Sequence, residues 1–114
     1  MEDGAVTEPG QSPPHQGDVL ISSPSPLTGE RELYTVVSAD IYNTAGGPTV
    51  LVAEIETGTR YRASAYATET DYGVVLADRV AWLPVDMLGE YFGQLTDTQR
   101  SRVINQIVAV LRGH

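Results

Sequence analysis

The sequence contains no cysteine and no lysine. The absence of cysteine excludes disulfides and thiolate metal sites, and it is typical of proteins from a reducing cytoplasm. No apolar run approaches the roughly 20 residues that a membrane span needs, and the N-terminus shows no secretory signal. We therefore expect a cytoplasmic protein that has no membrane partner.

Positive charge is scarce and comes only from arginine. The chain has seven basic residues against fifteen acidic ones, which gives a net charge of −8. An acidic chain does not hold polyanions by bulk charge, so any nucleic-acid contact must come from a local arginine cluster. On a strand, Arg60 and Arg62 would share one face and could bind phosphate, and a solvated strand face is the alternative.

The length of 114 residues is enough for one domain with a single modest core. Residues 1–16, "MEDGAVTEPGQSPPHQ", are polar, rich in proline and glycine, and carry three acids without a basic residue. This composition predicts a flexible acidic tail. We expect residues 17–114 to form the folded domain.

Most of the domain has the pattern of short β-strands. β-branched and aromatic runs separated by proline and glycine predict strands over residues 17–22, 33–42, 49–56, 60–69, 74–84 and 89–95. The run over 49–56 starts with continuous apolar residues, which is typical of a strand buried on both faces. The run over 60–69 alternates and favours a half-exposed strand.

A C-terminal helix is predicted over residues 96–112. Thr96 and Gln99 have the spacing of a capping box, and Gly113 is a typical helix stop. The helical spacing predicts one apolar stripe made of Val103, Ile104, Ile107, Val108 and Leu111. Short strands followed by one helix indicate a mainly β domain, a small barrel with a C-terminal α-helix packed on it.

Several short motifs follow one another in a characteristic order. They are Gly17-Asp18-Val19, Val36-Val37-Ser38 with Tyr42-Asn43, Val50 to Ile55, Leu76-Ala77-Asp78-Arg79-Val80, and Gly93-Gln94-Leu95-Thr96. Together they resemble the MazF/PemK toxin family, over most of residues 17–113. The resemblance implies an SH3-like barrel with a C-terminal helix, and a homodimer.

The resemblance also implies a function. Members of this family are toxins of toxin–antitoxin pairs that cleave single-stranded RNA at short sequences. They need no metal or other cofactor, because the neighbouring ribose 2′-hydroxyl attacks the phosphate. The expected partners are therefore single-stranded RNA and an antitoxin protein.

The family uses an arginine before its second strand and a hydroxyl after its third. In this sequence Glu32 and Glu56 align with those two positions, and Arg31 and Thr57 stand next to them. The resemblance therefore predicts catalysis by Arg31, which would stabilise charge on the phosphate, assisted by Thr57. Arg60 or Arg62 would bind the RNA backbone. Alternatively, Glu32 and Glu56 occupy the site and repel phosphate, and the chain is a non-catalytic protein that binds a protein partner.

Three further patterns have plainer explanations. Trp82 could stack on a base, but its apolar surroundings favour the core or a dimer interface. Tyr61 and Tyr66 are interpreted as ordinary surface aromatics. Glu54 and Glu56 form a carboxylate pair on one strand face, and because nothing completes a metal or glycosidase site, they are interpreted as a polar strand end.

Overall fold

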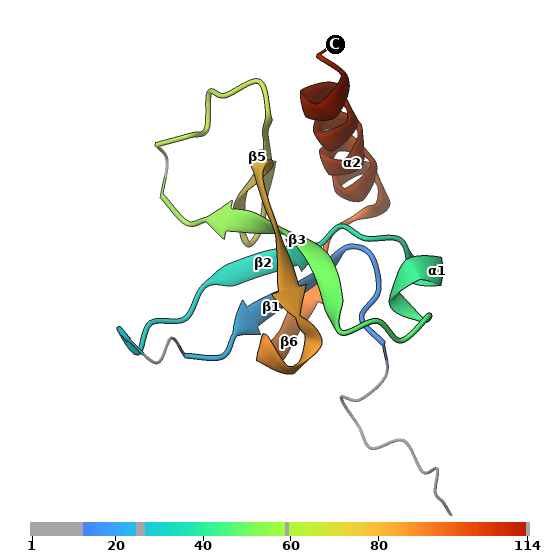
Figure 1. Ribbon diagram of the computed structural model, residues 1–114. Coiled ribbons are helices and arrows are strands. Elements are labelled where there is room, and N and C mark those ends of the chain that lie inside the picture. Colours follow the sequence, from blue (N-terminus) through green and yellow to red (C-terminus); the bar gives the residue numbers. More distant parts are fainter. Residues whose placement is uncertain (1–12, 25–26, 59, 114) are drawn as a thin grey trace, which may run out of the picture.

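The computed structural model describes residues 13–24, 27–58 and 60–113. Within these residues the chain forms one six-stranded sheet, two α-helices and a 3-10 turn (Figure 1). The strands are β1 (Asp18–Ser22), β2 (Leu33–Val36), β3 (Thr49–Glu56), β4 (Ala67–Thr70), β5 (Gly73–Pro84) and β6 (Leu88–Gln94). The helices are α1 (Asp40–Asn43) and α2 (Asp97–Arg112), and the 3-10 turn is η1 (Val85–Met87).

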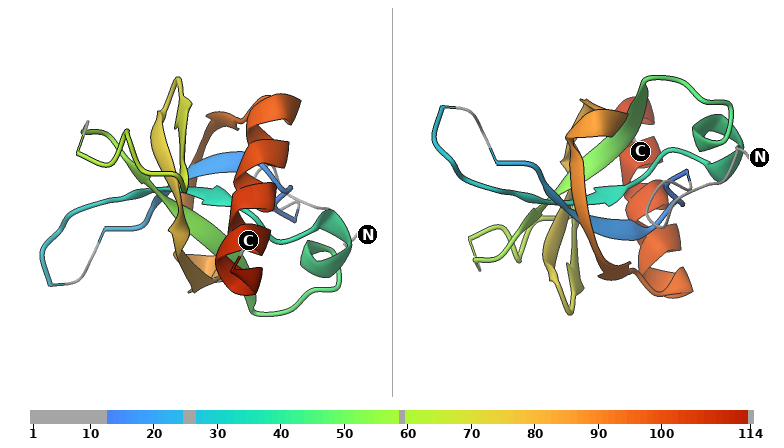
Figure 2. Two further views of the ribbon diagram at one scale, coloured as in Figure 1. Left: turned by 90° about the horizontal axis from the view of Figure 1, so that it is seen from above. Right: turned by 90° about the horizontal axis from the view of Figure 1, so that it is seen from below.

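The sheet is antiparallel, with the strand order β4-β5-β3-β2-β1-β6. It curls strongly, and α2 lies beside β5 on one face (Figures 1 and 2). The edge strands β4 and β6 do not pair with each other, so the sheet curves toward a barrel without closing. The predicted class, mainly β with a C-terminal helix, is confirmed.

Strand β3 is buried on both faces, as its continuous apolar run predicts. Ala53 and Ile55 belong to the cluster under α2, together with Val103 and Ile107 of the helix. On the same strand, Val50 and Val52 belong to a second cluster with Leu20 and Val36. Burial on both faces explains why this strand has little polar alternation.

Helix α2 begins and ends as predicted. The Thr96 side chain accepts a hydrogen bond from the Gln99 N–H, the Gln99 side chain accepts one from the Thr96 N–H, and Gly113 adopts a left-handed conformation. Only part of the predicted stripe is buried: Val103 and Ile107 are covered, whereas Leu111 is 79% exposed. The reason is that the C-terminal end of α2 extends past the sheet (Figure 1).

The predicted strand over residues 33–42 is too long. Strand β2 ends at Val36, and helix α1 follows from Asp40. Ser38 Oγ donates to Asn43 Oδ1 at 2.6 Å, Asn43 Nδ2 donates to the Ser38 carbonyl at 3.0 Å, and Leu51 N–H donates to Ser38 Oγ at 3.2 Å. These local side-chain bonds compete with strand pairing and turn the chain away from the sheet.

The predicted strand over residues 60–69 is also largely wrong. Residues 60–63 form a turn, and β4 begins only at Ala67. Backbone bonds within the segment, Ser64 N–H to the Tyr61 carbonyl and Ala67 N–H to the Ser64 carbonyl, hold the bends. Further on, Gln106 of α2 bonds Thr68 Oγ1 and the Ala67 carbonyl and so fastens β4 to the helix.

Residues 1–12 of the predicted tail lie outside the described residues. The described end of it contacts the domain: His15 N–H donates to Asp18 at 2.8 Å, and Gln16 N–H donates to Asp40 at 2.7 Å. The bond from Gln16, followed by the neighbouring His15, lowers the pKa of Asp40. Within the described part of the chain, neither helix has the length and apolar character to cross a bilayer.

Candidate functional site

A hollow of about 370 Å³ lies where β2 begins and β3 ends. Residues 30–33 and 54–57 line it. Leu33 pairs with Ile55 across the two strands, and Arg31 and Thr57 each lie two residues beyond this last pair, at the same end of β2 and β3. The segments 27–32 and 60–66 project from the same side of the sheet (Figures 1 and 2).

Arg31 and Thr57, the two residues predicted to be catalytic, line this same hollow. Four carboxylates line it as well: Glu30, Glu32, Glu54 and Glu56. Arg31 Nη1 lies 3.8 Å from Glu90 Oε1, and both side chains are at least half exposed. An exposed pair at this distance is weak. The hollow therefore combines one loosely held guanidinium with four acids.

Tyr34 does not line the hollow, but it contacts Glu32, one of the carboxylates that do. Its hydroxyl donates to Glu32 Oε1 at 3.1 Å, and Glu54 is its cross-strand partner. Burial, followed by the negative charge of Glu32, its hydrogen bond and the charge of Glu54, raises the pKa of Tyr34 to about 12. The tyrosine thus stays protonated up to high pH and can donate to the Glu32 carboxylate.

The predicted RNA-binding pair, Arg60 and Arg62, does not share a strand face, because both lie in the turn. Arg60 stacks over Tyr61, with its guanidinium carbon 4.9 Å from the ring centroid. Arg62 Nε instead pairs with Glu69 Oε2 at 3.2 Å. The two arginines therefore have different neighbours, and only Arg60 joins an aromatic ring.

A further arginine contacts the same ring. Arg79 Nη2 donates to the Tyr61 hydroxyl at 2.7 Å, and Arg79 Nη1 lies 3.5 Å from Glu54 Oε1. Sequence reasoning did not single out Arg79 and took Tyr61 for a surface aromatic. The sequence did contain a signal for Arg79, because this residue lies within Leu76 to Val80, one of the motifs on which the family resemblance rests.

Trp82 is not in the core. Its side chain is 57% exposed, and its ring packs against Tyr42 at a centroid distance of 5.7 Å. Val80, on the same face of β5, is also partly exposed. The assignment of Trp82 to the core is therefore wrong, and its place in a dimer interface stays a prediction.

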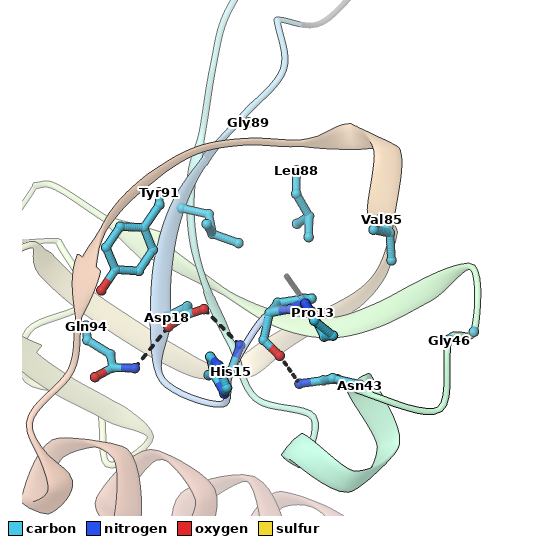
Figure 3. A pocket seen from close by; sticks show the side chains of 13 residues that line it. Pro13, His15, Asp18, Asn43, Gly46, Val85, Leu88, Gly89, Tyr91 and Gln94 are labelled. Carbon is cyan, nitrogen blue, oxygen red and sulfur yellow. Dashed lines mark hydrogen bonds between the residues drawn. The ribbon is translucent and has the colours of Figure 1, made fainter. Parts of the chain in front are cut away.

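A larger hollow of about 880 Å³ lies between β1, β6 and the segment that carries α1 (Figure 3). Its acid, Asp18, has both carboxylate oxygens bonded, one by His15 N–H and the other by Gln94 Nε2 at 3.0 Å. Much of the rest is apolar, including Leu20 and Leu88. None of the predicted site residues lies in it, so the smaller hollow is the candidate site.

The described residues contain no group of three histidine, aspartate or glutamate side chains arranged to hold a metal ion. The four glutamates of the hollow are therefore not gathered as a ligand set. What the arrangement offers chemically is a guanidinium, a hydroxyl and carboxylates, which are groups for charge stabilisation and proton transfer.

Neither the family models nor the curated proteins contain a match to this sequence. Solved structures do match. An endoribonuclease in complex with its cognate antitoxin, from a Mycobacterial species, is 23% identical with a TM-score of 0.72, covering 88% of this chain and 95% of that one. An endoribonuclease from a Mycobacterial species is 23% identical with a TM-score of 0.69, and the match covers 90% of this chain and 93% of that one.

A third similar structure is the MazE–MazF complex of Deinococcus radiodurans. It is 19% identical with a TM-score of 0.72, and the match covers 88% of this chain and 96% of that one. The three matches extend over nearly the whole of the solved chains, and the same strands and terminal helix account for them. The chain therefore has the fold of the MazF endoribonucleases.

Proposed function

We propose that this protein is the toxin of a toxin–antitoxin pair and cleaves single-stranded RNA at specific sequences without a metal. The observation that carries the proposal is that Arg31 and Thr57 line one hollow in a fold that two similar endoribonucleases share. The register of β2 and β3 supports it, since Arg31 and Thr57 each lie two residues beyond the last pair, Leu33 and Ile55.

In the proposed reaction the ribose 2′-oxygen attacks the adjacent phosphorus. The new bond joins the 2′-oxygen to phosphorus, and the bond to the 5′-oxygen breaks, leaving a 2′,3′-cyclic phosphate and a 5′-hydroxyl. The proton of the 2′-hydroxyl passes to solvent water, and the 5′-oxygen gains a proton from solvent water. Arg31 would stabilise the charge that grows on the phosphate oxygens, and the Thr57 hydroxyl would donate to one of them.

The same proposal includes partners. Two of the similar structures are complexes with an antitoxin, which supports an antitoxin partner for this chain. Exposed apolar side chains on β5, Val80 and Trp82, support a homodimer. A cytoplasmic location follows from the RNA substrate and the absence of cysteine.

The direct test is to incubate the purified protein with a long single-stranded RNA in EDTA and to map the cut ends. We expect discrete cuts, and a loss of about 100-fold or more in the cleavage rate for Arg31→Ala. Arg102→Ala, on the exposed side of α2, is the matched control and keeps full activity. Undiminished cleavage by Arg31→Ala would disprove the assignment of this residue.

The second candidate function is that of a non-catalytic binding protein with the same fold. It is favoured by one observation, that Glu32 and Glu56 line the hollow along with Arg31. Four carboxylates in one hollow attract a basic segment and repel phosphate. Replacing Glu32 and Glu56 by glutamine separates the two functions, because a nuclease would become faster whereas a binder of basic segments would lose its partner.

A further inference from the structure

The ring of Tyr61 contacts two guanidinium groups. The guanidinium carbon of Arg79 lies 4.5 Å from the ring centroid, and that of Arg60 lies 4.9 Å from it. Arg79 also donates to the tyrosine hydroxyl at 2.7 Å. Both guanidinium carbons thus lie within 4.9 Å of the centre of one ring, which concentrates positive charge at this place.

The base of this cluster is well fixed. Tyr61 is partly buried and packs against the apolar cluster of Ala67, Val74 and Leu76. Arg79 lies in a β-bulge of β5: Leu76 pairs with Glu54 and Val80 with Ala53, so the residues between them have no partner on β3. A bulge changes the direction of the side chains it carries, and here it directs Arg79 toward the turn at residues 60–63.

Arg79 connects this cluster to the candidate cleavage site. Its second contact, at 3.5 Å, is Glu54 Oε1, and Glu54 lines the hollow that contains Arg31 and Thr57. The Arg79 side chain is 46% exposed, so a ligand in the hollow can reach it. Arg62 is not part of the cluster, because it pairs with Glu69 on β4.

We propose that Arg60 and Arg79, held by Tyr61, bind an RNA backbone phosphate next to the scissile one. The inference rests on the proposed endoribonuclease function. Guanidinium groups bind phosphate through paired hydrogen bonds, and in a chain with a net charge of −8 a concentrated cationic site is the place for a polyanion. Tyr61 is a positioning residue, and Glu54 is the ligand of Arg79 that the phosphate replaces.

The test measures binding of a short single-stranded RNA with 2′-O-methyl groups, which cannot be cleaved, by fluorescence anisotropy over a range of salt concentrations. For Arg79→Gln and for Arg60→Gln we expect roughly tenfold weaker binding and a salt slope reduced by about one, as for the loss of one phosphate contact. Tyr61→Phe keeps the ring and loses only the bond to Arg79, so it weakens binding less. The control, Arg112→Gln at the end of α2, binds as the wild type does.

A second arm tests the role of Glu54. Glu54→Gln frees Arg79 and should tighten RNA binding several-fold, and this gain should disappear in the double variant Glu54→Gln, Arg79→Gln. A gain that persists in the double variant would mean that Glu54 only repels RNA, and it would overturn the role given to the Glu54–Arg79 pair.

The failure of this inference can be told from the failure of the proposed function. If the wild type cleaves and binds RNA and the Arg79→Gln and Arg60→Gln variants bind it equally well, only the phosphate site is disproved. If the wild type neither cleaves nor binds RNA, both proposals fail.

Discussion

Among the buried polar side chains, Thr35 differs from the others. Asp18, Ser38, Asn43 and Thr68 each make side-chain hydrogen bonds. Thr35 lies in the middle of β2 with no exposed surface, and its hydroxyl has no hydrogen-bond partner among the described residues. A buried hydroxyl without a partner lowers stability, because its hydration is lost without replacement.

We predict that Thr35→Val stabilises the protein, since valine has nearly the same shape without the hydroxyl. The expected gain in the free energy of unfolding is about 1 kcal/mol, measured by urea denaturation. Thr35→Ser is the control: it keeps the hydroxyl and removes a methyl group, so it should destabilise. A Val variant less stable than the wild type would mean that the hydroxyl is satisfied in solution.

Tyr34 gives a prediction about pH. Burial and the charges of Glu32 and Glu54 raise its pKa from 10.0 to about 12 in the folded state. Between those values the folded protein keeps a proton that the unfolded chain releases, so stability falls as the pH rises from about 10 to about 12. In the Tyr34→Phe variant, the stability should not show this decrease between pH 10.0 and about 12.

The pKa itself can be read from the ultraviolet absorbance of tyrosinate, as the difference between the wild type and Tyr34→Phe. Glu32→Gln should lower the pKa only in part, because burial is the largest cause and remains. A Tyr34 that titrates at its ordinary value would contradict both the burial of its side chain and its contact with Glu32.

At the level of elements, β1 and β6 approach each other unusually closely. Their pairing changes register twice, between Val19 and Leu20 and between Leu20 and Ser22. At the second change, a Cβ atom on Gly89 would collide with the carbonyl oxygen of Ile21 and the backbone of Ser22. Glycine is needed there because backbone atoms occupy the place of a side chain.

We therefore predict that Gly89→Ala destabilises the protein by about 1–3 kcal/mol, as overpacking does, with the loss measured as a lower midpoint of urea unfolding. Gly47→Ala is the matched control, since its nearest neighbour would be the Tyr42 hydroxyl at 3.8 Å, an ordinary contact. Equal stability of the two variants would show that β6 can move away from β1.

At the level of the whole molecule, the proposed homodimer can be tested through Trp82. The Trp82 ring is exposed. Within the described residues, the one aromatic ring that it contacts is that of Tyr42, which is itself exposed. If this face joins two copies, Trp82→Ser should reduce the mass measured by light scattering from two chains to one. Tyr91→Ser, an exposed aromatic of β6, should leave the mass unchanged. If light scattering gave the mass of a single chain for the wild type, the homodimer would be disproved.

Net charge and local charge lead to different expectations for this protein. The chain is strongly acidic, yet the hollow, the turn at residues 60–63 and the bulge of β5 bring Arg31, Arg60 and Arg79 to one region of the sheet. Each of Arg31 and Arg79 has a glutamate nearby in the free protein. RNA binding at such a site requires the phosphate to replace a carboxylate, which makes the affinity sensitive to single glutamates.

The elements predicted well are those with a dense local signal. The apolar run of residues 49–56 is strand β3, and the capping box at Thr96 with the stop at Gly113 bounds α2, because these patterns fix backbone conformation within a few residues. The elements predicted wrongly, residues 37–42 and 60–66, carry apolar and aromatic residues typical of strands. There, hydrogen bonds from Ser38 and Asn43, and the backbone bonds of the turn, decided the conformation.

The sequence by itself determined the order of strands along the chain and the C-terminal helix, and its resemblance to a known family pointed to Arg31 and Thr57 as candidates. Only the tertiary structure decided that these two residues line one hollow with four glutamates, and that Arg79 and Arg60 meet on Tyr61. The physical reason is that strand patterns depend on neighbouring residues, whereas the site depends on the register between β2 and β3 and on a bulge in β5. Register and bulges arise from pairing between distant segments, which no local pattern contains.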